Sequence, residues 1–474
     1  MLSERDKLTG KSSDKESLSQ RLATVLACTG YADLPPQVVT DAKRSVLDWL
    51  GSALAGAIEP AARMVQGVAK CLGSAQEATV FAGGRSSAAN AALVNGVASH
   101  ILELDDVHKG SIVHPAAAII PAALGVAEKE HADGHAFLLA VALGYEAALR
   151  IGEAVIPSHY HYWHPTGTVA TFGSAVAAGS LLKLSATQMA DALGNAGTQA
   201  AGLWEFNSDG TMSKHLHPGK AAFNGVLSAD LARAGFTGAA KILEGERGFF
   251  QAMSASFDPT RITEGLGKTW KISENCYKLH SCCGHTHTAI DIALDLRSQR
   301  KWSSEDVLGK VTGVQVETYG PGYEIVKETN PRSPFQAKFS IAYCVAAGLL
   351  EGRVTLEQFS PQRFTPEGIS DYAVAELLQR TSVRVADDLT QKFPSAWPAR
   401  LVLTLNDGSV FRGSSDYPRG NPENPVSTRQ LEEKFLALVE SRFGYDTASS
   451  ALRATHSVEE CEDMSTLFCN LLLE

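Results

Sequence analysis

Histidine–proline pairs open three Ala/Gly-rich helical patterns of this chain. The pairs are His114-Pro115, His164-Pro165 and His217-Pro218, more than 14 His and 19 Pro in 474 residues produce by chance. Because proline favours the first helical position, each histidine is predicted to lie at or near an N-cap. A helix N-terminus attracts carboxylates and keeps a neighbouring imidazole neutral. The alternative is that these are three unrelated caps of a helical protein.

The distribution of helical and strand patterns predicts a mainly α fold with two domains. A chain of 474 residues is too long for one ordinary core. Helical periodicity runs to about residue 270, gives way to alternating strand-like segments and an Asn406-Asp407-Gly408 hairpin signal, and then returns. We predict a disordered N-terminus (1–16), a large all-helical domain (17–272 plus 420–474) and an inserted, smaller α+β lid domain (273–419).

Composition excludes several classes of protein. The net charge is −10, and no Lys/Arg run is long enough to follow a nucleic-acid backbone. The apolar stretches are too short or too interrupted to span a membrane, and the eight cysteines form no disulfide framework. No dinucleotide or phosphate-loop motif is present, so no cofactor is expected. We predict a cytoplasmic protein with a small-molecule substrate and no nucleic-acid or membrane partner.

Carboxylates and histidines gather before the first His-Pro pair. His100, Glu103, Asp106 and His108 precede His114 within fifteen residues. Such a set suits a metal site or a general base, and the alternative is a solvated helix end.

Two further clusters surround the other His-Pro pairs. The segment 159–164 has histidine spacing that suits a metal, but we favour an aromatic loop from which only His164 reaches a substrate. In the segment 212–220, Lys214 is suited to pairing with a carboxylate or with an enolate-like charge. The alternative for that segment is a basic surface turn.

The segment 278–287 resembles a set of metal ligands. Cys282 and Cys283 are adjacent, however, and adjacent cysteines rarely both bind one tetrahedral ion. The segment falls where helical patterns give way to α+β patterns, and interdomain clefts often hold small-molecule sites. Together the four clusters favour proton abstraction next to a carboxylate, followed by loss of hydroxide or carbon dioxide without a cofactor.

Four motifs in order resemble the MmgE/PrpD family. They are Glu103-Leu-Asp-Asp106 with His114-Pro; Trp163-His164-Pro-Thr-Gly; Thr211-Met-Ser-Lys214-His-Leu-His217 with Ala221-Ala-Phe-Asn-Gly225; and Lys278 followed by Cys-Cys283 and His287. The family includes dehydratases of 2-methylcitrate, decarboxylases of cis-aconitate and epimerases of iminodisuccinate. The resemblance implies a helical domain with a smaller α+β lid domain, a homodimer and chemistry without a metal.

The resemblance also implies roles for single residues. His114 would transfer a proton, with His164 as its partner or as a ligand of a substrate carboxylate. Lys214 would neutralise a carboxylate, and Glu103 and Asp106 would orient the histidines. The substrate-binding positions implied by the same motifs are Lys278, Cys283, His217 and His287.

We therefore expect a cofactor-independent lyase acting on a small di- or tricarboxylate. The favoured reaction is a dehydration of the 2-methylcitrate type with histidine acid/base catalysis. Decarboxylation of the cis-aconitate type and epimerisation of the iminodisuccinate type are the alternatives within the family. A metal-dependent hydrolase and a non-catalytic polycarboxylate binder are the alternatives from other classes.

Overall fold

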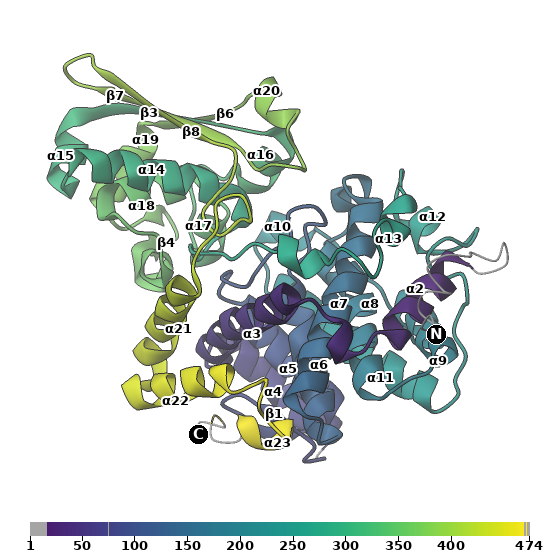
Figure 1. Cartoon of the computed structure of the whole chain (residues 1–474). Helices are drawn as coiled ribbons and strands as arrows, with labels where there is room; N and C mark the ends of the chain where they lie inside the picture. Colours follow the sequence, from purple (N-terminus) through teal and green to yellow (C-terminus); the bar gives the residue numbers. More distant parts are fainter. Residues whose placement is uncertain (1–16, 74, 469–470, 472–474) are drawn as a thin grey trace. The chain divides into compact units, whose positions relative to one another are not determined.

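The chain divides into two compact units (Figure 1). The computed structural model describes residues 17–73, 75–468 and 471, so the predicted disorder of residues 1–16 lies outside the described residues. The first unit contains the described residues up to Ile101, Gly110–Asn275 and those from Thr428 onwards. The second contains Leu102–Lys109 and Cys276–Ser427. Helices dominate the secondary structure, which confirms the predicted mainly α class.

One segment belongs to a different unit from the one expected. The sequence places residues 102–109 in the helical domain, but they pack with the second unit. Val107 forms a β-bridge with Cys276, and the Ser281 hydroxyl donates to the Leu102 carbonyl at 2.6 Å. These long-range hydrogen bonds leave no periodic pattern in the sequence, so the assignment could not be made from it.

Helices build most of the first unit. Its helices are α2 (Leu18–Cys28), α3 (Pro36–Ala57), α4 (Pro60–Leu72), α5 (Ala88–His100), α6 (Pro115–Lys129), α7 (Gly134–Val155), α8 (Pro165–Leu181), α9 (Ala186–Gly197), α10 (Phe206–Asp209), α11 (Ser213–Arg233), α12 (Phe249–Met253), α13 (Thr260–Thr263), α21 (Thr428–Phe443), α22 (Tyr445–His456) and α23 (Met464–Leu467). The expectation of an all-helical unit misses one antiparallel hairpin, β1 (Ala78–Val80) with β2 (Gly84–Ser86). Three-residue strands are too short to show alternation.

The His-Pro pairs predict two of the three helix starts correctly. His114 and His164 are the N-cap residues of α6 and α8, with proline at the first helical position. The prediction for His217 is wrong, because α11 already begins at Ser213 and Pro218 lies inside it. An interior proline costs a helix one hydrogen bond, and the packing of α11 outweighs that cost.

Small residues let the central helices of the first unit approach closely. A Cβ on Gly96 of α5 would lie 2.8 Å from the Cα of Gly219 on α11. A Cβ on Gly144 of α7 would lie 2.9 Å from the carbonyl oxygen of Gly173 on α8. Backbones in near contact need glycine at the crossing, so the Ala/Gly-rich patterns produce a tightly packed bundle.

The C-terminal helix α21 completes the first unit by packing on α3. A Cβ on Gly51 of α3 would lie 3.1 Å from the ring of Phe435. Beside this contact, Lys434 Nζ donates to a carboxylate oxygen of Asp48 at 2.6 Å, and the Asp48 side chain is fully buried. Segments from both ends of the chain therefore share one core.

A four-stranded sheet with helices packed against it forms most of the second unit. The strand order is β6 (Thr381–Val385), β3 (Val311–Thr318), β7 (Ala399–Leu405), β8 (Val410–Ser415). The β3–β6 pair is parallel and the others antiparallel; β7 pairs with β8 from Ala399↔Ser415 to Thr404↔Val410, which confirms the predicted hairpin. A small hairpin joins β4 (Phe364–Thr365) and β5 (Gly368–Ile369).

The helices of the second unit share one apolar core with the sheet. They are α14 (His287–Arg300), α15 (Ser304–Lys310), α16 (Gly320–Val326), α17 (Pro334–Lys338), α18 (Ile341–Glu351), α19 (Tyr372–Gln379) and α20 (Asp387–Thr390). Figure 1 shows α14 running beside the sheet, and the buried Ile290 and Ala293 of this helix lie in one cluster with Leu401 and Leu403 of β7. No helix among the described residues is long and apolar enough to cross a membrane.

Candidate active site

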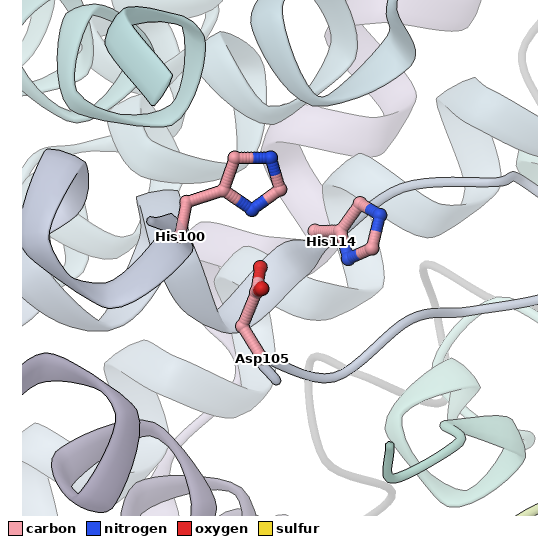
Figure 2. Close-up of side chains that lie close together, drawn as sticks. All are labelled: His100, Asp105 and His114. Atoms are coloured by element: carbon pink, nitrogen blue, oxygen red, sulfur yellow. The ribbon is translucent and has the colours of Figure 1, made fainter. Parts of the chain in front are cut away.

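Five histidines of the first unit form one cluster, here called the histidine cluster: His100, His114, His164, His215 and His217. The ring centroid of His100 lies 4.9 Å from that of His114, 5.9 Å from that of His164 and 6.1 Å from that of His215. His100 and His114 come from α5 and from the N-cap of α6, and Figure 2 shows their two rings. Asp105, the third side chain in Figure 2, belongs to the second unit. Four helices, α5, α6, α8 and α11, thus deliver imidazoles to one place.

His164 and His217 form a hydrogen-bonded pair within this cluster. Their Nδ1 atoms lie 3.0 Å apart, and their ring centroids 5.2 Å. Two nitrogens at this distance need one proton between them, so one ring donates and the other accepts. Aromatic side chains cover the pair, because the rings of Trp204 and Phe206 lie 5.0 and 5.7 Å from that of His164.

The N-termini of α6 and α8 lie side by side at the cluster. The backbone N–H of His114 donates to the hydroxyl of Thr166, in the first turn of α8, at 3.1 Å. Each helix is long enough to carry a dipole, and each presents its positive end here. Two such ends favour the binding of carboxylates, as the His-Pro pairs predicted.

Two lysines of α11 lie beside the histidines, Lys214 and Lys220. Lys214 is 3% exposed, so the predicted alternative of a basic surface turn is wrong for this residue. Lys220 is only partly exposed, and its Nζ donates to three backbone carbonyls. The turn expected at 212–220 is helix, because α11 starts at Ser213.

Burial and positive neighbours keep the pair of imidazoles neutral. Burial lowers the pKa of His164 far below its usual range, and His217, Lys214 and the other histidines act in the same direction. Burial also lowers the pKa of His217 to about 3, assisted by Lys220, His100 and Lys214. At neutral pH both rings of the pair are therefore uncharged and share one hydrogen-bonding proton between their Nδ1 atoms.

In the second unit, the structure pairs two of the predicted residues. Lys278 Nζ lies 3.4 Å from a carboxylate oxygen of Glu103, and both side chains are almost fully buried. Burial acts to lower the pKa of Lys278, but Glu103 and Asp105 outweigh it and hold the pKa above its usual value. The two carboxylates therefore favour the ammonium form of Lys278 despite its burial. Asp106 is buried in the same segment.

The remaining candidates of the second unit surround a buried histidine–aspartate pair. His280 Nε2 lies 3.0 Å from an Asp291 carboxylate oxygen, and the rings of His280 and His287 are 5.0 Å apart. Burial lowers the pKa of His287. Cys283 is buried next to them, and its N–H donates to the Lys338 carbonyl at 2.9 Å.

The metal alternative for two of the clusters finds no support in the described residues. His159 uses both ring nitrogens in hydrogen bonds, 2.9 Å to the Met253 carbonyl and 2.8 Å to the Thr168 hydroxyl. Neither nitrogen is available to an ion. Within the described part of the segment 278–287, no three ligand atoms of His, Cys, Asp or Glu lie within 4.8 Å of one another.

Sequence reasoning missed Lys220 as a site residue, along with Trp204 and Phe206. Trp204 lies in the loop after α9 and Phe206 begins the four-residue α10, and segments this short show no helical or strand period that would place them on His164. Lys220 follows His217 by three residues, which places both on one face of a helix. That spacing was a usable signal, but it depended on knowing that α11 begins before His217.

The fold and the first-unit cluster define a mainly α protein with neutral imidazoles and a buried lysine at paired helix N-termini. The chain matches the MmgE/PrpD N-terminal domain over residues 20–262 and the MmgE/PrpD C-terminal domain over residues 280–460. It belongs to the MmgE/PrpD family, which confirms the resemblance that the motifs carry.

Relatives of this chain cover nearly its whole length. It is 28% identical over 469 residues to a cis-aconitate decarboxylase of Homo sapiens, covering 95% of this chain and 94% of that protein. It is 28% identical over 467 residues to the cis-aconitate decarboxylase-like protein oryM of Aspergillus oryzae, covering 92% and 93%. A cis-aconitate decarboxylase of Aspergillus terreus is 27% identical over 428 residues, covering 86% of each chain.

Proposed function

We propose that this protein is a cofactor-independent carboxy-lyase acting on cis-aconitate or a closely similar unsaturated tricarboxylate. The carrying observation is the neutral His164–His217 pair beside buried Lys214 at two helix N-termini. The names of the relatives favour loss of carbon dioxide over the dehydration that the sequence analysis preferred. The homodimer and the cytoplasmic location stay predictions.

In the proposed reaction, one proton replaces one carbon dioxide. The bond to the departing carboxyl carbon breaks, and its electron pair enters an allylic system conjugated with a remaining carboxylate. A proton then adds to the far carbon of that system, so that a trianion and a proton give a dianion and carbon dioxide. The role of the protein is to hold the carboxylates, stabilise the delocalised charge and deliver the proton.

The residues of the first unit supply these functions. His114, at the less buried side of the histidine cluster, gives the proton, and the His164–His217 pair relays a proton to it. Lys214 and the positive ends of α6 and α8 offset the charge of the substrate. For the second unit we keep Glu103 and Asp106 as orienting residues and Lys278, Cys283 and His287 as substrate-binding residues.

A substrate panel followed by proton NMR tests the proposal. cis-Aconitate, citrate, 2-methylcitrate and iminodisuccinate are each incubated with the full chain, and released carbon dioxide is measured in parallel. We expect turnover of cis-aconitate with one carbon dioxide per product. Dehydration of 2-methylcitrate without release of carbon dioxide would contradict the proposal and support the dehydration that the sequence analysis favours.

A chelator arm tests the absence of a cofactor. After exhaustive dialysis against a strong chelator, we expect the rate to be unchanged. Loss of activity that one divalent ion restores would favour the metal-dependent alternative. Binding of tricarboxylates without turnover of any of them would favour the non-catalytic binder.

A further inference from the structure

Lys220 is a half-buried cation for which the proposed mechanism has no role. Its Nζ donates to the carbonyl oxygens of Gly167 at 3.2 Å, Gln199 at 3.3 Å and Ala201 at 2.7 Å. An ammonium group has three N–H donors, and these three acceptors match them. A neutral amine has only two donors and would turn its lone pair towards one of the carbonyls. The arrangement therefore suits the charged form.

The three carbonyls belong to the two segments that hold His164. Gly167 lies in the first turn of α8, three residues after His164. Gln199 and Ala201 lie in the loop after α9, and the next residue of that loop, Gly202, accepts the backbone N–H of His164 at 2.9 Å. Lys220 itself comes from α11, which carries His217. One ammonium thus joins α8, the loop and α11.

The loop and α8 approach each other closely beside Lys220. A Cβ on Gly167 would lie 2.7 Å from the Ala201 carbonyl oxygen and 3.2 Å from the Cβ of His217. The convergence of three carbonyl dipoles at this place is unfavourable without a cation between them. The charge of Lys220 offsets that repulsion and lets the loop lie against α8.

We propose that Lys220 is a positioning residue of the His164–His217 pair. Its ammonium fixes the Nδ1–Nδ1 separation by holding the carbonyls of both segments around His164, and its charge acts on His217 within one helical turn. The inference rests on the proposed function only in the kinetic experiment, because the NMR experiments need no turnover.

The charges around the pair set the pH range in which this device works. His217 is faced by Lys214 and Lys220 from α11, His100 from α5 and His164 from the start of α8. Burial lowers the pKa of Lys220 to about 8. The ammonium is therefore present at neutral pH and is lost as the pH rises through about 8, which would release the three carbonyls.

NMR of the full chain with ¹⁵N-labelled histidine detects the hydrogen bond of the His164–His217 pair without any substrate. A hydrogen bond between two Nδ1 atoms gives a scalar coupling between their nitrogens. We expect this coupling in wild type and in the control Lys241→Met, whose lysine is exposed, and its loss in Lys220→Met. A coupling of unchanged size in folded Lys220→Met would overturn the proposal.

A pH series on wild type keeps the inference testable if Lys220→Met does not fold. The coupling should weaken between pH 7 and pH 9, following the loss of the ammonium. A coupling that is constant over this range would overturn the proposal.

The activity arm separates positioning from stability. In Lys220→Ala we expect kcat to fall about 10- to 100-fold with little change in KM, and methylammonium to restore part of it. A wild-type kcat in this variant would overturn the proposal. If wild type turns over no tricarboxylate, the proposed function fails, while the nitrogen coupling still decides the role of Lys220.

Discussion

The candidate site combines neutral and charged side chains, which come from the histidine cluster and from the neighbouring Lys214. The His164–His217 pair is held neutral by burial, while Lys214 carries positive charge in the same surroundings. His114 is less buried than His164 and occupies an N-cap. This division lets substrate charge and proton transfer be tested with separate substitutions.

Removing His114 should stop turnover without disturbing the fold. Loss of a general acid typically costs on the order of 10²–10⁴ in rate. We expect kcat of His114→Ala on cis-aconitate to fall within that range, with the melting temperature unchanged. The exposed His131→Ala serves as the matched control and should keep full activity. A variant retaining more than a tenth of wild-type kcat would remove His114 from the mechanism.

Lys214→Met should weaken the use of substrate in a way that salt does not erase. Truncating a buried charge that faces a carboxylate costs roughly 2–5 kcal/mol, whereas an exposed charge is worth less than about 1 kcal/mol. We expect kcat/KM to fall by more than tenfold at both low and high salt. The control is the exposed Lys241→Met. An effect that disappears at high salt would place Lys214 outside the substrate site.

The sequence indicates residues that belong to motifs, but not those that depend on tertiary contact. His114, His164 and Lys214 follow from the His-Pro pairs and from the family motifs, and the structure places all of them at the histidine cluster. Lys220 acquires its surroundings only when α11 packs against α8 and the loop after α9. No local pattern contains that information.

Among the helices, glycine crossings place the site residues. α5 carries His100, α11 carries Lys214 and His217, and the two helices cross where Gly96 meets Gly219. Any widening of this crossing moves both sets of side chains apart. Helix packing and site geometry are therefore coupled.

Gly96→Ala tests this coupling against a matched glycine. A Cβ at Gly96 would meet Gly219 backbone at 2.8 Å, whereas Gly67 of α4 has nothing within 4 Å. We expect Gly96→Ala to cost about 1–3 kcal/mol and to lower kcat, because overpacking displaces backbone. Gly67→Ala should stabilise the protein by roughly 0.4–1 kcal/mol with full activity. Chemical denaturation measures the stability of the two variants, and steady-state kinetics measures their kcat. Equal effects of the two substitutions would contradict the coupling of helix packing to site geometry.

Element boundaries were predictable wherever a local signal fixed them. Ser185, a residue type that favours the N-cap, caps α9. The Asn-Asp-Gly segment turns β7 into β8 as expected. The His217-Pro218 pair predicts a start of α11 that is too late, because Pro218 lies inside the helix rather than in its first turn. Local signals therefore predict helix ends well. A proline inside a packed helix, however, has the same local sequence pattern as a proline that starts a helix.

For the molecule as a whole, one buried carboxyl links stability to pH. Burial raises the pKa of Glu128 to about 7, although the Thr79 N–H and Arg85 act in the opposite direction. The folded state therefore binds this proton more tightly than the unfolded state, whose value is 4.5. From this group alone, stability is highest below pH 4.5 and falls as the pH rises to about 7.

Glu128→Gln should remove that part of the pH dependence. We expect the free energy of unfolding of wild type, relative to the variant, to fall by up to about 3 kcal/mol between pH 4.5 and pH 7.5. Urea denaturation across this range measures the difference. The control Glu264→Gln, at an exposed position, should run parallel to wild type. A wild-type curve parallel to that of Glu128→Gln would contradict the assignment.

The packing of α21 on α3 has a consequence for how the protein is made. A ribosome releases α3 early, but Lys434 and Phe435, which cover Asp48 and Gly51, emerge only after the whole of Cys276–Ser427. At roughly 5–20 residues per second, this delay is on the order of tens of seconds. During that interval the apolar face of α3 that packs against α21 is exposed to solvent, and a chaperone has time to bind it. The second unit waits for no later segment and is free to fold first.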